Sequence, residues 1–127
     1  MGRGELIGAS LARLKSSLPD ANVSKRAMNV AGFVVSARWI ALERREDDVL
    51  AILQELAAAS RDEPGCRGYR LHHSRDNPRE FLLYEVYDDE QAFDAHVASE
   101  HFQRLVLKEG IPLLQERVRL FYDLLGD

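Results

Sequence analysis

The chain has 127 residues, the length of one ordinary domain. Its 46% hydrophobic and 30% charged residues are typical of a globular fold, and its net charge of −4 gives no basic field that would indicate nucleic-acid binding. No apolar run approaches the ~20 residues of a membrane span, so no membrane partner is expected. The single cysteine, Cys66, excludes an internal disulfide and a cysteine-based zinc site.

The first 31 residues are predicted to form an N-terminal extension. Residues 1–28 carry a net charge of +3, whereas the remainder of the chain carries −7. Four apolar residues follow helical spacing, namely Ile7, Leu11, Leu14 and Leu18. We expect a short amphipathic helix that packs on its own domain or on a partner subunit; the alternatives are a disordered or mis-started leader and a targeting peptide. Because the segment has no continuous apolar stretch of the secretory kind, a cytoplasmic protein is expected.

Residues 32–127 are predicted to form one domain that begins with a strand and a helix. β-branched, aromatic and apolar residues run from Phe33 to Leu42, which indicates a strand. The next apolar residues, from Val49 to Leu56, recur at helical spacing behind three acidic residues that suit the positive end of a helix dipole. This helix is predicted to end at residues 62–65, because Pro64 disfavours helical geometry at Glu63 and Gly65 tolerates a positive φ.

Two predicted strands form a hairpin in the middle of the chain. Cys66–His73 and Glu80–Tyr87 are joined by a short polar turn. A broken helix follows, in which one segment ends near His96 and a second begins at Ser99, which can cap it. A last strand is predicted over Arg117–Leu125.

This β-α-β-β-α-β order predicts an α+β, ferredoxin-like (split β-α-β) fold, with helices on one face of an antiparallel sheet. The third strand alternates between two apolar sets: Phe81, Leu83 and Tyr87 on one face, and Leu82, Tyr84 and Val86 on the other. Helices cover only one face, so the other would expose roughly a few hundred Å² of apolar surface, more than a monomer usually tolerates. We therefore expect a homodimer in which a second copy covers that face.

Three stretches resemble the antibiotic biosynthesis monooxygenase (ABM) family: residues 63–69 (EPGCRGY), 81–87 (FLLYEVY) and 95–102 (AHVASEHF). With the element order, the resemblance extends over residues 32 to 125 and leaves the first 31 residues without a counterpart. It implies a dimeric ferredoxin-like fold that assembles as an α/β-barrel. The family includes quinol monooxygenases and autoinducer-degrading isomerases.

The resemblance also implies a monooxygenase that uses no metal and no flavin, so no cofactor is expected. Its partners would be O2 and a small aromatic substrate of phenolic, quinol or polyketide-like type. The protein must then remove a proton, stabilise the resulting anion and exclude water. Lowering the pKa of a phenol from about 10 to about 7 requires roughly 4 kcal/mol, which one or two well-placed donors in a dry pocket can supply.

Three residues are predicted as catalytic: His96, His101 and Glu85. In the ABM-like interpretation, the histidines lie where a helical segment covers the pocket, so that one acts as a base or donor; alternatively, they stabilise helix ends. Because the histidines are five residues apart and need not share a face, their spacing does not indicate a metal site. Glu85 lies in an apolar strand and is either a proton acceptor with a raised pKa or the partner of a buried arginine. The arginines considered are Arg38, Arg70 and Arg119.

Three aromatic residues, Trp39, Tyr84 and Phe102, are predicted to bind the substrate by stacking, unless they are core or interface residues. Two further functions remain open: isomerase or enolate chemistry on a small metabolite, and a non-catalytic dimeric ligand-binding module. The heme-degrading branch of the family fits less well, because its asparagine, tryptophan and histidine have no aligned set here. An enzyme predicts a closed cavity lined by His96 or His101 together with Tyr84 or Trp39, whereas a binding module tolerates a collapsed cavity.

Overall fold

The computed structural model describes residues 29–126. The elements in chain order are β1 (Val30–Ala41), α3 (Glu46–Arg61), β2 (Cys66–His73), β3 (Glu80–Tyr87), α4 (Glu90–Ala98), the π-helix η1 (Phe102–Gly110), the 3-10 turn η2 (Ile111–Leu113) and β4 (Leu114–Leu125). The amphipathic helix predicted over residues 7–18 lies outside the described residues. Within residues 29–126, no helix is long and apolar enough to cross a membrane.

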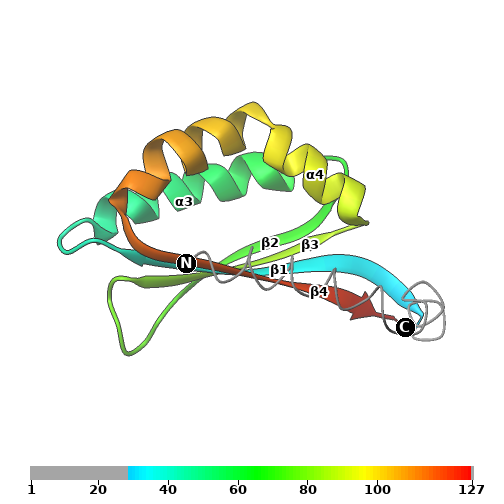
Figure 1. Cartoon of the computed structure of the whole chain (residues 1–127), viewed down its shortest axis with the longest axis horizontal. Helices are drawn as coiled ribbons and strands as arrows, with labels where there is room; N and C mark the ends of the chain where they lie inside the picture. The colour runs from blue at the N-terminus through cyan, green and yellow to red at the C-terminus, as the bar shows by residue number, and fades with distance from the viewer. Residues whose placement is uncertain (1–28, 127) are drawn as a thin grey trace, which may run out of the picture.

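The four strands form one antiparallel sheet in the order β2-β3-β1-β4. The helices α3, α4 and η1 lie together above one face of this sheet (Figure 1). This arrangement confirms the predicted α+β ferredoxin-like fold. Strand β1 begins at Val30 rather than Phe33, and β4 begins at Leu114 rather than Arg117, because the ladder between the two strands continues past their apolar runs, as far as Val30↔Leu125 and Ala41↔Leu114.

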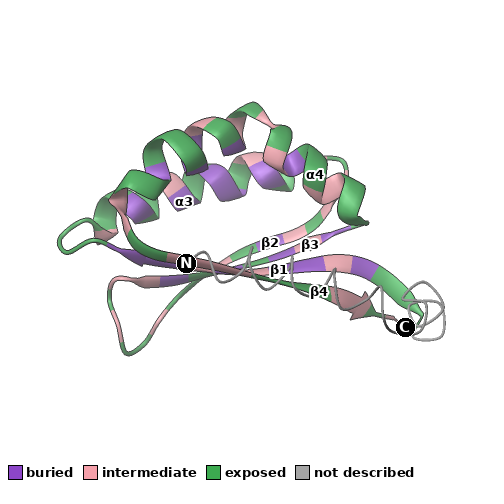
Figure 2. Ribbon diagram, in the orientation of Figure 1, coloured by how far each residue is buried: buried purple, intermediate pink, exposed green. Residues whose placement is uncertain are grey.

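The hydrophobic core lies between the sheet and the helices, where buried residues face one another (Figure 2). Alternate residues of β1 and β3 supply the floor of this core: Val35, Ala37, Trp39, Phe81, Leu83 and Tyr87. The helices supply the side chains that pack against these strand residues: Val49, Leu53, Leu56, Phe102, Leu105 and Val106. Each large side chain buried in this layer contributes about 1.5–3 kcal/mol relative to an exposed one, so this contact holds the helices on the sheet.

The opposite side of the sheet, called here the open face, carries large apolar side chains. Four of them remain partly exposed: Leu82 at 37%, Tyr84 at 40%, Leu120 at 38% and Tyr122 at 50%. The strand register places Tyr84 and Leu120 in one row on either side of Ser36, with Tyr122 in the neighbouring row. The described residues therefore leave several large apolar side chains partly exposed on the side of the sheet that the helices do not cover.

Candidate active site

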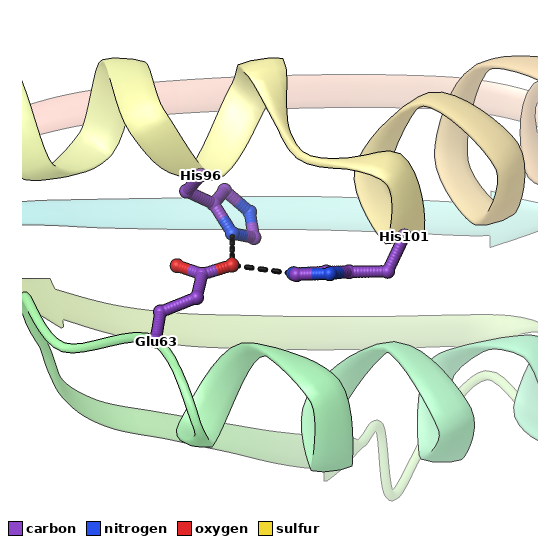
Figure 3. A group of neighbouring side chains, drawn as sticks. All are labelled: Glu63, His96 and His101. Carbon is purple, nitrogen blue, oxygen red and sulfur yellow. Dashed lines mark hydrogen bonds and ion pairs between the residues drawn. The ribbon is translucent and has the colours of Figure 1, made fainter.

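A carboxylate lies between two imidazole rings in the space between the helices (Figure 3). Glu63 Oε2 is 2.8 Å from His96 Nδ1 and 2.5 Å from His101 Nε2. Glu63 comes from the corner after α3, His96 from α4, and His101 from the residue that precedes η1. The side chain of His96 is 1% exposed, whereas those of Glu63 and His101 are 14% and 20% exposed. The cluster thus extends from the interior toward the surface.

Ser99 sets the geometry that brings the two histidines together. Its hydroxyl donates to His96 O at 2.6 Å and accepts from the Phe102 N–H at 3.1 Å, so a single side chain ends α4 and begins η1. The resulting break turns His101 toward the same carboxylate as His96. Spacing alone did not indicate this convergence, because five residues along an unbroken helix would separate the two rings by more than a full turn.

The corner that carries Glu63 is held close to α4. The backbone N–H of Glu63 donates to Ser60 O at 3.1 Å, and its carbonyl accepts from the Cys66 N–H at 3.1 Å. A Cβ atom on Gly65 would lie 2.5 Å from the Cβ of Ala92 in α4. Gly65 does not use its tolerance of a positive φ, since none of the described glycines has one. Glycine is required there because the backbone and α4 approach so closely.

Glu85 lies behind the histidine cluster, on the face of β3 that the helices cover. It is 4% exposed, and Tyr87 donates its hydroxyl hydrogen to Glu85 Oε1 at 2.6 Å. The same oxygen is 3.9 Å from His96 Nε2. His96 therefore lies between two carboxyl groups, with one ring nitrogen facing each.

Burial dominates the acid–base properties of both groups. It raises the pKa of Glu85 to about 7, although the hydrogen bond from Tyr87 and the charges of Arg119 and Arg117 lower it. Burial likewise lowers the pKa of His96, although the hydrogen bond and charge of Glu63 raise it. Near neutral pH, Glu85 thus exists in both protonation states while His96 is held neutral.

Of the three arginines predicted as partners for Glu85, only Arg119 lies on its side of the sheet. Arg38 donates to Glu116 at 3.0 Å on the open face. Arg70 pairs in register with Tyr84, so its side chain also belongs to the open face. The charge of Arg119 lowers the pKa of Glu85, and Tyr87, which the sequence had placed only in the core, donates a hydrogen bond to it.

A small cavity lies beside Glu85, between the sheet and the helices. Its volume is about 10 Å³, which is room for one water molecule. Trp39, Phe102 and Glu85 line it, so three of the predicted site residues meet at one place. Neither His96 nor His101 lines this cavity, and both contact Glu63.

Tyr84 does not reach this cavity. Successive strand residues point to opposite sides of a sheet, and Glu85 faces the helices. Tyr84 therefore lies on the open face, where it is 40% exposed. The structure separates it from the other predicted substrate-binding residues, Trp39 and Phe102.

The Glu63, His96 and His101 side chains offer three possible metal ligands within 4.8 Å of one another. Ligands around a tetrahedral divalent ion, with bonds of about 2.1 Å, stand about 3.4 Å apart. The two N···O separations of 2.8 and 2.5 Å are shorter and match hydrogen bonds. The Glu63 carboxylate would have to move away from both imidazole rings before an ion could bind between them.

Glu63 is the residue of this cluster that sequence reasoning missed. The sequence marked it only as the end of a helix, next to Pro64. A carboxylate at a tight corner that leads straight into a buried strand was the available signal, but nothing local indicated that α4 would cross above it. Its other oxygen, Oε1, is buried and has no hydrogen-bond partner among residues 29–126.

Comparison with known proteins places this geometry in a family. Residues 32–107 match the family model for antibiotic biosynthesis monooxygenases. The chain belongs to the antibiotic biosynthesis monooxygenase family. Membership supports a monooxygenase-like role in general terms.

Several solved structures align with this chain over nearly their whole length. Protein SO0527 from Shewanella oneidensis is 29% identical to this chain, with a TM-score of 0.72. The alignment covers 76% of this chain and 93% of that protein. PA3566 from Pseudomonas aeruginosa is 28% identical, with a TM-score of 0.71. Its alignment covers 76% of this chain and 96% of that protein. A crystal structure described as an antibiotic biosynthesis monooxygenase is 30% identical, with a TM-score of 0.68. Its alignment covers 74% of this chain and 99% of that protein.

One curated relative is similar over a shorter segment. Protein sll1783 from Synechocystis is 30% identical over 64 residues, which is 50% of this chain and 44% of that protein. The chain therefore spans less than half the length of this relative.

Proposed function

We propose that this ABM-family protein is a cofactor-independent monooxygenase that oxidises a phenolic, quinol or polyketide-like small molecule with O2. The observation that carries the proposal is Glu85, a carboxyl group only 4% exposed, with a pKa of about 7, on the wall of an aromatic cavity. A phenolate transfers an electron to O2 far more readily than a neutral phenol does. A buried base that titrates near neutral pH supplies the required proton acceptor.

The proposed reaction needs no external reductant. When a phenol reacts with O2, one oxygen atom enters the ring and the other leaves as water, so that the ring becomes a quinone. Glu85 accepts the phenolic proton, while Trp39 and Phe102 present flat faces against which an aromatic ring can stack. Arg117 and Arg119 also line the cavity, and their positive charges favour the substrate anion.

The cavity is too small for such a substrate as it stands. Pockets that bind small molecules typically enclose about 300 Å³ or more, whereas this one encloses about 10 Å³. Substrate entry therefore requires the side chains over the cavity to move. Phe102 is the first residue of η1, and π-helical segments recur near functional sites, which supports η1 as the part that moves.

We propose that two copies of the chain form a homodimer through the open face. The support is the set of partly exposed large side chains on that face, which includes Leu82, Leu120 and Tyr122. An apolar surface of this kind is typical of an interface between copies. A cytoplasmic location remains part of the proposal and suits Cys66, which is a free cysteine.

Oxygen uptake with a panel of quinols and phenols tests the proposed chemistry. The wild-type protein is expected to consume O2 with at least one member, and Glu85→Gln is expected to lower the rate about 100-fold or more, as loss of a general base does. Glu43→Gln changes an exposed carboxylate in the same way and serves as the control. No uptake across the panel, or full activity in Glu85→Gln, contradicts the proposal.

A dimeric ligand-binding module is the second candidate, because the small cavity suits a protein without turnover. Trp39 is the only tryptophan of the chain and lines the cavity. Quenching of its fluorescence by a quinol, with no O2 consumed, would favour this candidate. Isomerase or enolate chemistry would use Glu85 as the same base. Incubating the protein with a panel of enolisable small metabolites and following their conversion by NMR tests this chemistry.

A further inference from the structure

We propose that Glu63, His96 and His101 form a binding site for one divalent transition-metal ion of the zinc type. The ion would be structural, because neither histidine lines the cavity beside Glu85, where the proposed substrate binds. It would join three segments that lie apart in the chain, namely the corner after α3, the last turn of α4 and the start of η1. The proposed function and this site are therefore independent of each other.

The donor atoms select the class of ion. Two imidazole nitrogens and one carboxylate oxygen lie within 4.8 Å of one another. Zinc binds histidine nitrogen and carboxylate oxygen, and a site with three protein ligands leaves a further position for water. Mg2+ and Ca2+ prefer oxygen ligands throughout. For a given set of nitrogen and oxygen ligands, Zn2+ also binds more tightly than Fe2+ or Mn2+, so Zn2+ is the expected occupant.

The spacing of the ligand atoms is close to that around a metal ion. Glu63 Oε2 is 2.8 Å from His96 Nδ1 and 2.5 Å from His101 Nε2. Ligands with bonds of about 2.1 Å stand about 3.0 Å apart at right angles and about 3.4 Å apart in a tetrahedron. A shift of the Glu63 carboxylate by less than about 1 Å therefore gives either arrangement. The hydrogen bonds hold the ligands together until an ion takes the place of the shared hydrogen.

Glu63 has a second oxygen that an ion would use. This atom, Oε1, is buried and has no hydrogen-bond partner among residues 29–126. A buried acceptor without a partner destabilises a fold. When the carboxylate binds an ion through both oxygens, Oε1 gains a partner.

The two nitrogens of His96 face two carboxyl groups, as in many metal sites. Nδ1 faces Glu63, and Nε2 is 3.9 Å from Glu85 Oε1. Metal-binding histidines commonly present their second nitrogen to a carboxylate, which fixes the ring and its tautomer. When Nδ1 binds the ion, the ring hydrogen moves to Nε2, where it faces Glu85. One carboxyl group thus shares the ion with His96, and the other supports the ring.

The ligands are held in place and are accessible from solvent. Ser99 ends α4 and begins η1, which fixes His96 and His101 relative to each other before an ion binds. The side chains of Glu63 and His101 are 14% and 20% exposed, so an ion reaches them without opening the core. Preorganised ligands lose little conformational entropy on binding.

Zinc binding by the full chain, treated first with a chelator, tests the site. Calorimetric titration with ZnCl2 is expected to give one ion per chain, and the Tm should rise by about 5 °C or more at a free Zn2+ concentration a hundredfold above the Kd. Mg2+ should leave the Tm unchanged. Glu63→Gln and His101→Ala are expected to weaken binding about tenfold or more. His72→Ala, which removes an exposed histidine of β2, is the matched control and should bind as the wild type does.

Absence of zinc binding by the wild type, or equal binding by Glu63→Gln and His101→Ala, overturns the site. An equal loss in His72→Ala would show that zinc binds at surface histidines, which also overturns it. Thermal melts without zinc confirm that the variants are folded.

A measurement on the wild type alone decides the inference even if the variants do not fold. In side-chain 15N NMR, added zinc is expected to shift the signals of His96 and His101 and to move the ring hydrogen of His96 from Nδ1 to Nε2. The signals of His72 and His73, which lie outside the cluster, should stay in place. Bound zinc that leaves the His96 and His101 signals unchanged overturns the site.

Discussion

At the residue scale, Glu85 shows what a buried ionisable group costs the fold. Its folded-state pKa of about 7 exceeds the ordinary value of 4.5, so the folded chain binds a proton that the unfolded chain has already lost between these two pH values. Its contribution to stability is therefore present below pH 4.5 and is lost as the pH rises through about 7. A side chain retained at such a cost fits a role in proton transfer better than a role in packing.

Glu85→Gln is expected to stabilise the protein at pH 8 and to leave it nearly unchanged at pH 4. Glutamine still accepts the hydrogen bond from Tyr87 but never ionises. The pKa difference corresponds to a free energy of unfolding about 3 kcal/mol larger for the variant at pH 8. Urea denaturation at the two pH values measures it. An equal difference at both pH values would show that ionisation of Glu85 is not the cause.

At the element scale, local patterns predicted the strands and helices but not how they meet. The two-residue period of β3 and the helical spacing in α3 are properties of neighbouring residues, so the sequence alone indicates them. Convergence of His96 and His101 on Glu63 depends on the break at Ser99 and on how closely α4 crosses the corner, which are long-range features. The fold was therefore predictable, whereas the candidate site was predictable only in part.

Gly65→Ala tests whether this close crossing holds the site together. The added methyl group would lie 2.5 Å from the Ala92 Cβ, so α4 or the corner must shift. We expect a loss of about 1 to 3 kcal/mol in stability, as for an overpacked core position. The His96 side-chain signal in NMR should also move, because Glu63 is displaced. Gly68→Ala is the control, since only Val86 lies near its Cβ, at 4.0 Å; equal effects of the two changes would contradict the explanation.

At the scale of the whole molecule, the sheet separates two surfaces with different chemistry. Its covered side carries Glu85 and the cavity, and its open face carries partly exposed apolar residues such as Leu120 and Tyr122. The same alternation along each strand produces both surfaces. Dimerisation through the open face would therefore leave a complete helix-covered site in each subunit.

Leu120→Glu is expected to convert the proposed dimer into a monomer. The residue is 38% exposed in the middle of β4, and a carboxylate at the centre of an apolar interface would be buried without a partner. Sedimentation velocity at micromolar concentration should give twice the chain mass for the wild type and the single mass for the variant. Leu107→Glu, at a 42% exposed position on η1, should remain dimeric.

A wild-type monomer, or a dimer that survives Leu120→Glu, would remove the open face as the interface. Because Leu120 and the Glu63 cluster lie on opposite sides of the sheet, the monomeric variant should keep the wild-type side-chain NMR signals of His96 and His101. A shift of those signals in Leu120→Glu would mean instead that the second copy of the chain is needed to form the site.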